Sequence, residues 1–352
     1  MPTELTLALQ PRARLDLINV TAHIQAVQPD FLRRYQQALY YSYHTTAGYP
    51  EQRLCERLGY RREALEDFFR TFQRLFPPGA GYCHDQLELR QELSEAARQH
   101  EPRNADAHLT YMGAGLLPAA CYRHAPDRPV YLVDLDGIYE GHVRARRTTV
   151  VGFNRIERLA TCRLTVPMPP HRIASVNLRD SHLGFFETLA QWLQQFDLQH
   201  GRLDLLLPAE EQHAALTVNE YETLLMRHDL AEVLRNPFRF MAETGRHALQ
   251  NPRAVPGKAL NYAKYDLVRL VNEFIDRLGL NESLVERVLN KFLSLPAARF
   301  LRMKRGLHLL VAPDASGLPT IRQGRYQSPI LIQWERPPHN SRMIEVRLYR
   351  FD

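Results

Sequence analysis

The stretch HLTYMGAGLLPA (residues 108–119) has a counterpart near the end of the chain, FLRMKRGLHLLVA (residues 300–312). Aligning the two places Met112 on Met303. The period is about half the chain, which indicates duplication and fusion rather than the short repeats of a solenoid. A fused pair of copies can mimic a symmetric dimer, because one polypeptide then supplies both sides of the interface.

Alternating and helical apolar patterns on either side of this repeat divide each half into strands and helices. In the first half they predict strands over 4–21 (with a turn), 38–43, 108–123, 128–137 and 144–153, and helices over 22–37 and 62–76. In the second half they predict strands over 172–178, 201–208, 301–312, 328–337 and 343–351, and helices over 184–198, 221–234 and about 258–295. The order of elements thus repeats.

A proline-rich stretch marks the predicted boundary between the halves, because proline interrupts both helices and sheets. We therefore expect an α+β fold with two tandem sheet-and-helix domains, 1–158 and 172–352, joined by a linker at 159–171. The second domain carries a helical insertion at about 236–296. Together the two domains are predicted to form an intramolecular pseudo-dimer.

The composition indicates a soluble protein with a sizeable core, since 45% of the 352 residues are hydrophobic. The net charge of +6 favours anionic partners, but the basic residues are scattered, so nucleic-acid binding is not indicated. The 4 cysteines form no CxxC pair, and residues 1–17 lack the apolar segment of a secretory signal. We expect a cytoplasmic protein without a membrane partner. Nucleotide-binding glycine loops and the GxSxG elbow are also missing.

Short motifs in both halves resemble those of one known family. They are HTTA (44–47), NADAHLTYMGAGL (104–116), YLVDLDG (131–137), RARRTTVVGF (144–153), LTVNEYETLLMRHDL (216–230) and GRYQSPILIQWE (324–335). In this order they resemble the YjbQ family, whose members are small proteins described as secondary thiamine-phosphate synthases. The resemblance covers most of the chain except the helical insertion, and it implies a YjbQ-like fold for each half.

Neither half holds the whole family pattern. Gln52 and Arg53 stand where the pattern has Asn-Glu, and Glu211 stands where the second half would have the histidine of HTT. The first half keeps the histidine elements, and the second half keeps the elements that the first lacks. We therefore expect complementary loss, in which the fused pair keeps one composite, histidine-rich site between the halves. The alternative is that both half-sites are decaying and the activity has changed or been lost.

The resemblance, carried over residue by residue, implies the reactive groups of the site. The histidines of the first half are His44, His84 and His108. Three imidazoles from separate segments can bind a divalent metal ion such as zinc or magnesium, and they can also transfer protons or donate to phosphate. Both interpretations stay open: all three are candidate metal ligands, and His44 and His108 are candidate catalytic residues. Glu220, from the second half, is the predicted catalytic base.

The predicted substrate-binding residues offer hydroxyl, amide or guanidinium groups to a phosphate: Thr45, Thr46, Arg144, Arg146, Asn219 and Gln327. Arg144 and Arg146 alternate on a predicted strand, so both would face one phosphate. Structural explanations stand beside these roles. The threonines suit a turn, Asn219 suits a helix N-cap, and Asp229 is a surface helix acid unless the interface buries it.

The expected function is a YjbQ-like enzyme acting on a small phosphorylated substrate. Thiamine-phosphate synthase-type activity would join a pyrimidine-methyl diphosphate to a thiazole phosphate and release diphosphate, with fixed positive groups stabilising the leaving group. One alternative is a protein that binds a metal or a phosphorylated ligand without turnover. Another is an interaction protein that uses the helical insertion. Whether fused chains assemble further is left open.

Overall fold

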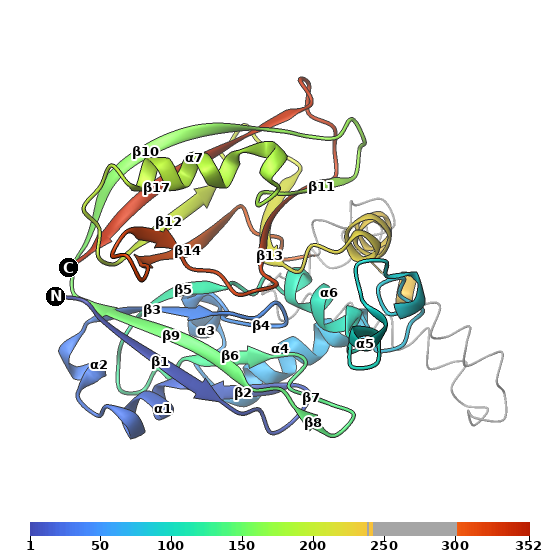
Figure 1. Ribbon diagram of the computed structural model, residues 1–352. Coiled ribbons are helices and arrows are strands. Elements are labelled where there is room, and N and C mark those ends of the chain that lie inside the picture. Colours follow the sequence, from blue (N-terminus) through green and yellow to red (C-terminus); the bar gives the residue numbers. More distant parts are fainter. Residues whose placement is uncertain (238, 242–300) are drawn as a thin grey trace, which may run out of the picture.

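The computed structural model describes residues 1–237, 239–241 and 301–352, which form a mixed helix-and-sheet fold (Figure 1). The predicted insertion at about 236–296 lies mostly outside these residues. Within the described part of the chain, none of the helices combines the length and apolarity that crossing a bilayer would take.

The N-terminal half contains two sheets and a hairpin. One sheet has the order β1 (Thr3–Leu9), β9 (Arg146–Phe153), β3 (Gln37–Ser42), β5 (Ala119–Arg123). The other has the order β2 (Asp16–Asn19), β6 (Tyr131–Asp134), β4 (Ala47–Gly48), and the hairpin is β7 (Ile138–Tyr139) with β8 (His142–Val143). The helices of this half are α1 (Val20–Val27), α2 (Phe31–Arg34), α3 (Gln52–Arg57), α4 (Arg62–Leu75), the 3-10 turn η1 (Leu87–Leu89), α5 (Glu95–Arg98) and α6 (Ala105–Gly113).

The C-terminal half also contains two sheets. One has the order β10 (Ile156–Pro167), β17 (Ser341–Phe351), β12 (Gly201–Leu206), β14 (Gly306–Pro313), β15 (Pro319–Ile321). The other has the order β11 (Ala174–Asn177), β16 (Ser328–Gln333), β13 (Ala214–Asn219). Its described helices are the 3-10 turn η2 (Ser181–Leu183), α7 (Phe185–Leu193), the π-helical turn η3 (Leu225–Asp229) and α8 (Leu230–Arg235).

The two halves share one strand order. In each, the first, last, third and fifth strands lie side by side in one sheet, in that order. The other sheet of each half consists of its second, penultimate and fourth strands, in that order. The short β7–β8 hairpin is not counted here. Every pairing in these four sheets is antiparallel.

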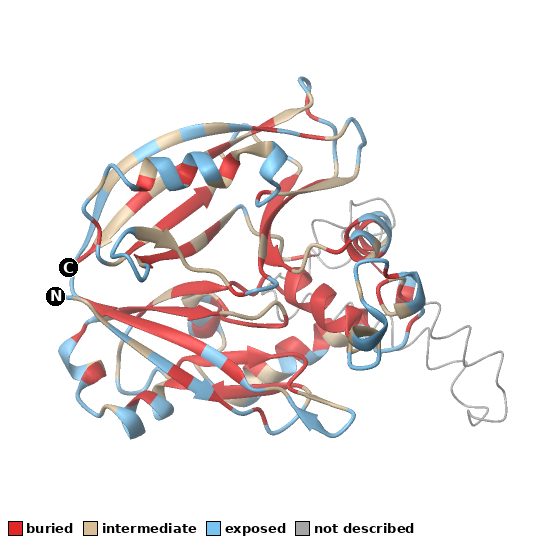
Figure 2. Ribbon diagram, viewed as in Figure 1, coloured by how far each residue is buried: buried red, intermediate tan, exposed pale blue. Residues whose placement is uncertain are grey.

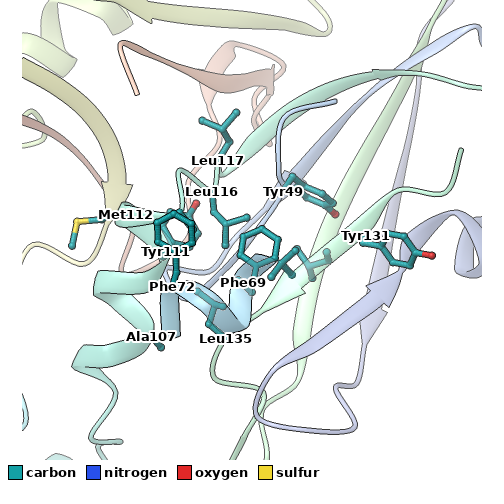
Figure 3. Close-up of a cluster of buried hydrophobic side chains, with 14 of the residues drawn as sticks. Tyr49, Phe69, Phe72, Ala107, Tyr111, Met112, Leu116, Leu117, Tyr131 and Leu135 are labelled. Atoms are coloured by element: carbon teal, nitrogen blue, oxygen red, sulfur yellow. The ribbon is translucent and has the colours of Figure 1, made fainter. Parts of the chain in front are cut away.

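The core of the N-terminal half lies between its helices and its sheets. The buried residues of α4 include Leu65, Phe68 and Phe72, at the spacing of one helical face. Figure 3 shows Phe72 of α4 gathered with Tyr111 of α6 in one hydrophobic cluster. Each fully buried phenylalanine of this kind contributes about 2–3 kcal/mol of transfer free energy. This packing holds α6 in a fixed position.

The prediction of a strand over 108–123 is wrong for its first part, which is the helix α6. All nine residues of α6 are buried (Figure 2), including the polar Asp106, His108 and Thr110, so the helix lacks the exposed polar face that marks a surface helix. Gly115, just after the helix, has φ +69°, a left-handed conformation that suits a chain leaving a helix. The second part of the predicted strand is β5, as expected.

The segment predicted as a linker, 159–171, is not a separate connection. Its first nine residues belong to the long strand β10, which pairs with β17. The two halves also meet through an apolar cluster that includes Leu39 and Val151 from one half and Leu310 from the other. The rings of Phe153 and Phe351 stack there with centroids 4.1 Å apart. The halves therefore join through packed sheets.

Candidate functional site

A cavity of about 690 Å³ lies where the two halves meet, beside α6 and the β7–β8 hairpin. The N-terminal half contributes most of its lining, including His108, Arg144 and Thr45. The C-terminal half contributes Glu220, just after β13, and Tyr326, before β16. We refer to this as the His108 cavity. It has the size of an ordinary small-molecule site.

His108 is held in a defined tautomer by Asn219 of the other half. Its Nδ1 lies 2.5 Å from Asn219 Oδ1, which also accepts the Glu220 N–H at 2.8 Å. The Asn219 amide nitrogen in turn donates to His108 O at 3.4 Å. Because Asn219 Oδ1 can only accept, His108 Nδ1 carries the proton. Nε2 then carries the lone pair. Burial holds the pKa of His108 well below its usual range, so the ring is neutral at pH 7.

Glu220 faces the basic nitrogen of His108. Its Oε2 lies 3.8 Å from His108 Nε2, and its Oε1 lies 3.6 Å from Nη2 of the buried Arg90. Burial raises the pKa of Glu220, while the Arg90 charge opposes that rise. Arg90 also binds Glu101 and Glu92, yet its Nη2 has no hydrogen-bond partner among the described residues. A carboxyl group and a neutral imidazole therefore lie together at the cavity wall.

His84 lies directly behind His108, with ring centroids 5.2 Å apart. Its Nδ1 is 3.2 Å from Glu222 Oε2, and its Nε2 is 3.3 Å from Asn104 Oδ1. Asn104 donates its amide to Asp136, which fixes its oxygen toward His84. Both ring nitrogens thus face acceptors, as in an imidazolium. Burial, the largest influence, lowers the pKa of His84, but the Glu222 hydrogen bond and the charges of Asp85 and Glu222 together give a net rise.

Asp229 joins the two halves through the main chain. Its carboxylate accepts the N–H groups of Cys83 and His84, at 2.8 and 2.9 Å. Asp229 ends the π-helical turn η3 and is buried, so it is not a surface acid. Burial raises its pKa to about 6, against the pull of the two N–H groups. Asn219 likewise is not a helix cap, because it ends strand β13 and binds His108.

Arg144 is the guanidinium group that reaches the His108 cavity. It forms an ion pair with Asp136, which is linked through Asn104 to His84. The side chain of Arg144 is 36% exposed, so part of the guanidinium remains available to a ligand. Asp136 is fully buried, and its Oδ1 has no hydrogen-bond partner within the described chain. Arg144 thus lines the cavity at the edge of a polar network that reaches His84, and its predicted phosphate-binding role stays a prediction.

Arg146 does not join Arg144 on a phosphate-binding face. It is buried, and it donates to both carboxylate oxygens of Asp134 at 2.6 and 2.7 Å and to Asp136 O at 2.8 Å. Thr46, also buried, accepts from Arg146 at 3.4 Å. Arg146 and Thr46 thus have buried structural partners, and this geometry does not favour the ligand-binding roles predicted for them. Strand alternation predicts on which face of the sheet a residue lies, but it does not predict that a buried carboxylate, here Asp134, lies on the same face and pairs with it.

His44 takes no part in the side-chain hydrogen bonds of His84 and His108. Its Nε2 accepts the backbone N–H of Arg147 at 2.8 Å. Burial, followed by the charges of Arg146, Arg144 and Arg147, lowers the pKa of His44 to about 3. The neighbouring Thr45 does line the His108 cavity. Thr45 thus lines the same cavity as His108, and His44 is not among the lining residues.

The predicted metal site does not fit this arrangement. Across the described residues, no cluster of three or more His, Cys, Asp or Glu side chains could hold a metal ion. His84 uses both ring nitrogens in hydrogen bonds, and His44 uses Nε2. A metal ligand needs a lone pair aimed at the ion, and the ring of His84 offers none because both of its nitrogens are in hydrogen bonds.

Gln327 is a structural residue that ties the halves together. Its Nε2 donates to the carbonyls of Ser42 and His44, at 2.8 and 2.9 Å. Its Oε1 accepts from Tyr41 Oη at 2.7 Å and from Gly324 N at 2.9 Å. All four hydrogen-bonding positions of the amide are occupied, and the residue is fully buried. The predicted substrate-binding role of Gln327 is therefore not supported by the geometry.

Sequence reasoning missed Glu222, Arg90 and Asp136. Glu222 is the second acid of the sequence NEYE, so its spacing from Glu220 was a usable signal for a shared face. Arg90 and Asp136 had no such signal. Arg90 lies in an irregular loop after η1, and its burial depends on contacts with distant acids.

Comparisons with known proteins give only remote structural similarity. No family model and no curated protein matches the chain. A YbjQ-like protein of unknown function from Sulfolobus solfataricus P2 is 14% identical, with a TM-score of 0.29, over 56% of this chain and 99% of that one. A hypothetical protein from Aeropyrum pernix K1 is 17% identical, with a TM-score of 0.27, over 55% and 100%.

A third structure is an uncharacterised protein of the YjbQ/UPF0047 family from Clostridium acetobutylicum. It is 10% identical, with a TM-score of 0.27, over 53% of this chain and 98% of that one. Each of these proteins thus aligns over nearly its own whole length with about half of the present chain. Similarity at this level carries no argument about activity.

Proposed function

We propose that the chain is an enzyme that acts on a small phosphorylated substrate in the His108 cavity. The observation that carries this proposal is the fixed tautomer of His108. Asn219 accepts a hydrogen bond from Nδ1 of the ring, so the lone pair is on Nε2, which faces Glu220 at the cavity wall. A neutral, oriented imidazole in a cavity is suited to general acid–base catalysis.

In this proposal His108 removes a proton from a substrate hydroxyl or water through Nε2. Glu220, predicted from the motifs as the base, acts in this proposal as the acid that gives a proton to a leaving oxygen, a role that the burial-raised pKa of its carboxyl group supports. Arg144 contacts a phosphate oxygen, and Thr45 offers a hydroxyl at the same wall. In this proposal His84 does not contact the substrate. A positive charge on His84 lowers the pKa of His108 and so helps to keep the His108 ring neutral.

We further propose that the chain is a duplicated and fused YjbQ-like protein with one composite site left. The repeated strand order supports the duplication. The contacts of Asn219, Glu220 and Asp229 with the histidine segments support complementary loss. A thiamine-phosphate synthase-type transfer, with release of diphosphate, is the specific reaction that the motif resemblance suggests.

The test is turnover of a panel of phosphate monoesters and diphosphates, measured as release of phosphate or diphosphate. The panel includes the pyrimidine-methyl diphosphate and thiazole phosphate pair. We expect His108→Gln and Glu220→Gln to lower kcat/KM by roughly 100-fold or more, as for loss of a general acid or base. His182→Gln, an exposed histidine in η2, is the matched control and should keep full activity.

Binding without turnover is the main alternative outcome. If calorimetry shows that a phosphorylated compound binds but wild type releases no product, the enzyme proposal fails. Loss of that binding in Arg144→Gln would then identify a ligand-binding protein. An interaction role for the helical insertion falls on residues outside the described chain, and no geometry supports or opposes it.

A further inference from the structure

A second cavity, of about 580 Å³, lies on the C-terminal half and shares no lining residue with the His108 cavity. Its floor is formed by strands β10, β17, β12 and β14 near the end of β12. Glu51 of the N-terminal half lines it as well, so this cavity also lies where the two halves meet. We refer to it as the His308 cavity.

Strand register explains why the floor of this cavity is polar. Leu205, Leu307 and Val346 pack into the hydrophobic core of the C-terminal half. The residues next to them along each strand point to the opposite face of the sheet. On that face one row across neighbouring strands reads Arg163, Glu345, Leu206, and the next row reads Arg347, Asp204, His308.

The positive charges on this face exceed what the nearby carboxylates neutralise. Glu345 is the ion-pair partner of both Arg163, at 3.2 Å, and Arg347, at 2.5 Å. One carboxylate therefore serves two guanidinium groups. Arg305, a third lining cation, donates to the carbonyl oxygens of Glu211, Leu207 and Pro208, which leave its charge unneutralised.

His308 adds an oriented ring to this wall. Its Nδ1 lies 2.6 Å from Asp204 Oδ1, so Nδ1 carries a proton and donates it to the carboxylate. Arg202 holds the same carboxylate at 2.6 Å. Nε2 of His308 makes no hydrogen bond within the described residues, and His308 lines the cavity. A phosphate oxygen or hydroxyl of a ligand can therefore form a hydrogen bond with Nε2.

The rim of the His308 cavity carries one more cation. Lys304 forms an ion pair with Glu51 across the two halves at 3.0 Å, and only 13% of the lysine side chain is exposed. The acids that face the cavity are Glu51, Glu210 and Glu345, against four arginine and lysine side chains and His308. This set suits a small, multiply charged anion rather than a metal ion or an apolar molecule.

We propose that the His308 cavity is a second ligand site, which binds a small phosphate-bearing anion through Arg163, Arg347 and His308. Guanidinium groups that share one carboxylate keep donors available to phosphate oxygens. The proposal does not depend on catalysis in the His108 cavity.

The test is calorimetric titration of the full chain with inorganic phosphate and with diphosphate at constant ionic strength. Wild type should bind at a site whose affinity falls about tenfold or more in Arg347→Gln, in Arg163→Gln and in His308→Gln. The matched control is Arg350→Gln, on the same strand β17, whose partner Glu157 lies away from the cavity. It should bind as wild type does.

Two results would overturn the proposal. One is equal affinity in Arg347→Gln, Arg163→Gln and Arg350→Gln, which would show that the cavity takes no part in binding. The other is a single phosphate site that is lost in Arg144→Gln, since Arg144 lines the His108 cavity and not the His308 cavity. Thermal unfolding of each variant checks that the fold is kept. Failure of turnover in the His108 cavity would leave a positive result here unchanged.

Discussion

At the residue scale, the feature that most needs explanation is a pair of adjacent imidazoles whose hydrogen-bond partners favour different protonation states. His84 and His108 lie edge to face, and both are buried. Glu222 stabilises the charged form of His84, while Asn219 offers His108 a neutral acceptor. Because two adjacent positive rings would repel each other, the first charge disfavours the second. The C-terminal half thus sets the proton positions on rings that the N-terminal half carries.

The protonation states of His84 and His108 can be measured by nitrogen NMR of histidine-labelled protein. At pH 7 we expect both ring nitrogens of His84 to carry protons, and His108 to carry one, on Nδ1. In Glu222→Gln the pKa of His84 should fall, because its charged partner is gone, so the ring should lose a proton at lower pH. In Asn219→Ala the fixed tautomer of His108 should give way to a mixture. A neutral His84 in wild type would contradict the assignment.

At the element scale, the loop before β16 crosses the end of β3 at very short range. A Cβ placed on Gly324 would lie 1.9 Å from the carbonyl oxygen of Tyr43. The same loop carries Gln327, whose amide binds the main chain just beyond β3. Neither backbone can yield without breaking these hydrogen bonds. Glycine is therefore required at 324 for close approach.

Replacing Gly324 by alanine should destabilise the protein by about 2–3 kcal/mol, as overpacking of a tight contact does. Gly79→Ala is the matched control. Gly79 has φ +70° with open space around its Cβ position, so alanine there should cost about 1 kcal/mol of backbone strain. The measurement is the thermal unfolding midpoint of both variants. An equal shift in the two would show that the contact at Gly324 can relax.

Strands were more predictable from the sequence than the side-chain partners of the site. Alternation identified β17, in which buried and partly exposed residues alternate. The strands β3 and β9 are buried almost throughout, and their aromatic and β-branched residues identified them instead. The helix α6 was missed because it is buried on all sides. Motif order pointed to His108, Asn219 and Glu220 together. It also pointed to Arg146 and Gln327, whose bonds to Asp134 and to the main chain only a folded structure reveals.

At the scale of the whole molecule, the two halves are held together by buried polar groups as well as by apolar packing. Asp229 binds the chain at Cys83 and His84, and Gln327 binds it at Ser42 and His44. Removing one partner of such a contact leaves a buried group unsatisfied, at a cost of about 1–3 kcal/mol. The free energy of unfolding should therefore change with pH where a buried acid of this junction, such as Asp229, gains or loses its proton.

Asp229 gives this response a definite direction. Its pKa is raised from 3.8 to about 6 in the folded state, so the folded state binds the proton more tightly than the unfolded state. Its contribution to the free energy of unfolding is full below about pH 4 and is lost as the pH rises through 6. The shift corresponds to roughly 3 kcal/mol.

Urea unfolding of wild type and Asp229→Asn between pH 4 and pH 7 measures this contribution. The difference in unfolding free energy between the two proteins should shrink as the pH rises, on top of a constant offset for the altered N–H contacts. Asp30→Asn, an exposed acid, is the control and should show no such trend. A difference that stays constant with pH would mean that Asp229 ionises in the folded state as an ordinary acid does.

The junction between the two halves has a consequence for the order of the chain. Asp352 O accepts the N–H groups of Asn154 and Arg155, and Thr3 lies opposite Gly152 in the sheet. The first and last strands therefore start and finish beside the connection from β9 to β10, where N and C lie together in Figure 1. A short bridge between the two ends, with a cut after Asn154, would exchange the order of the halves and preserve every strand pair. We therefore expect a circular permutant made in this way to fold as the original chain does.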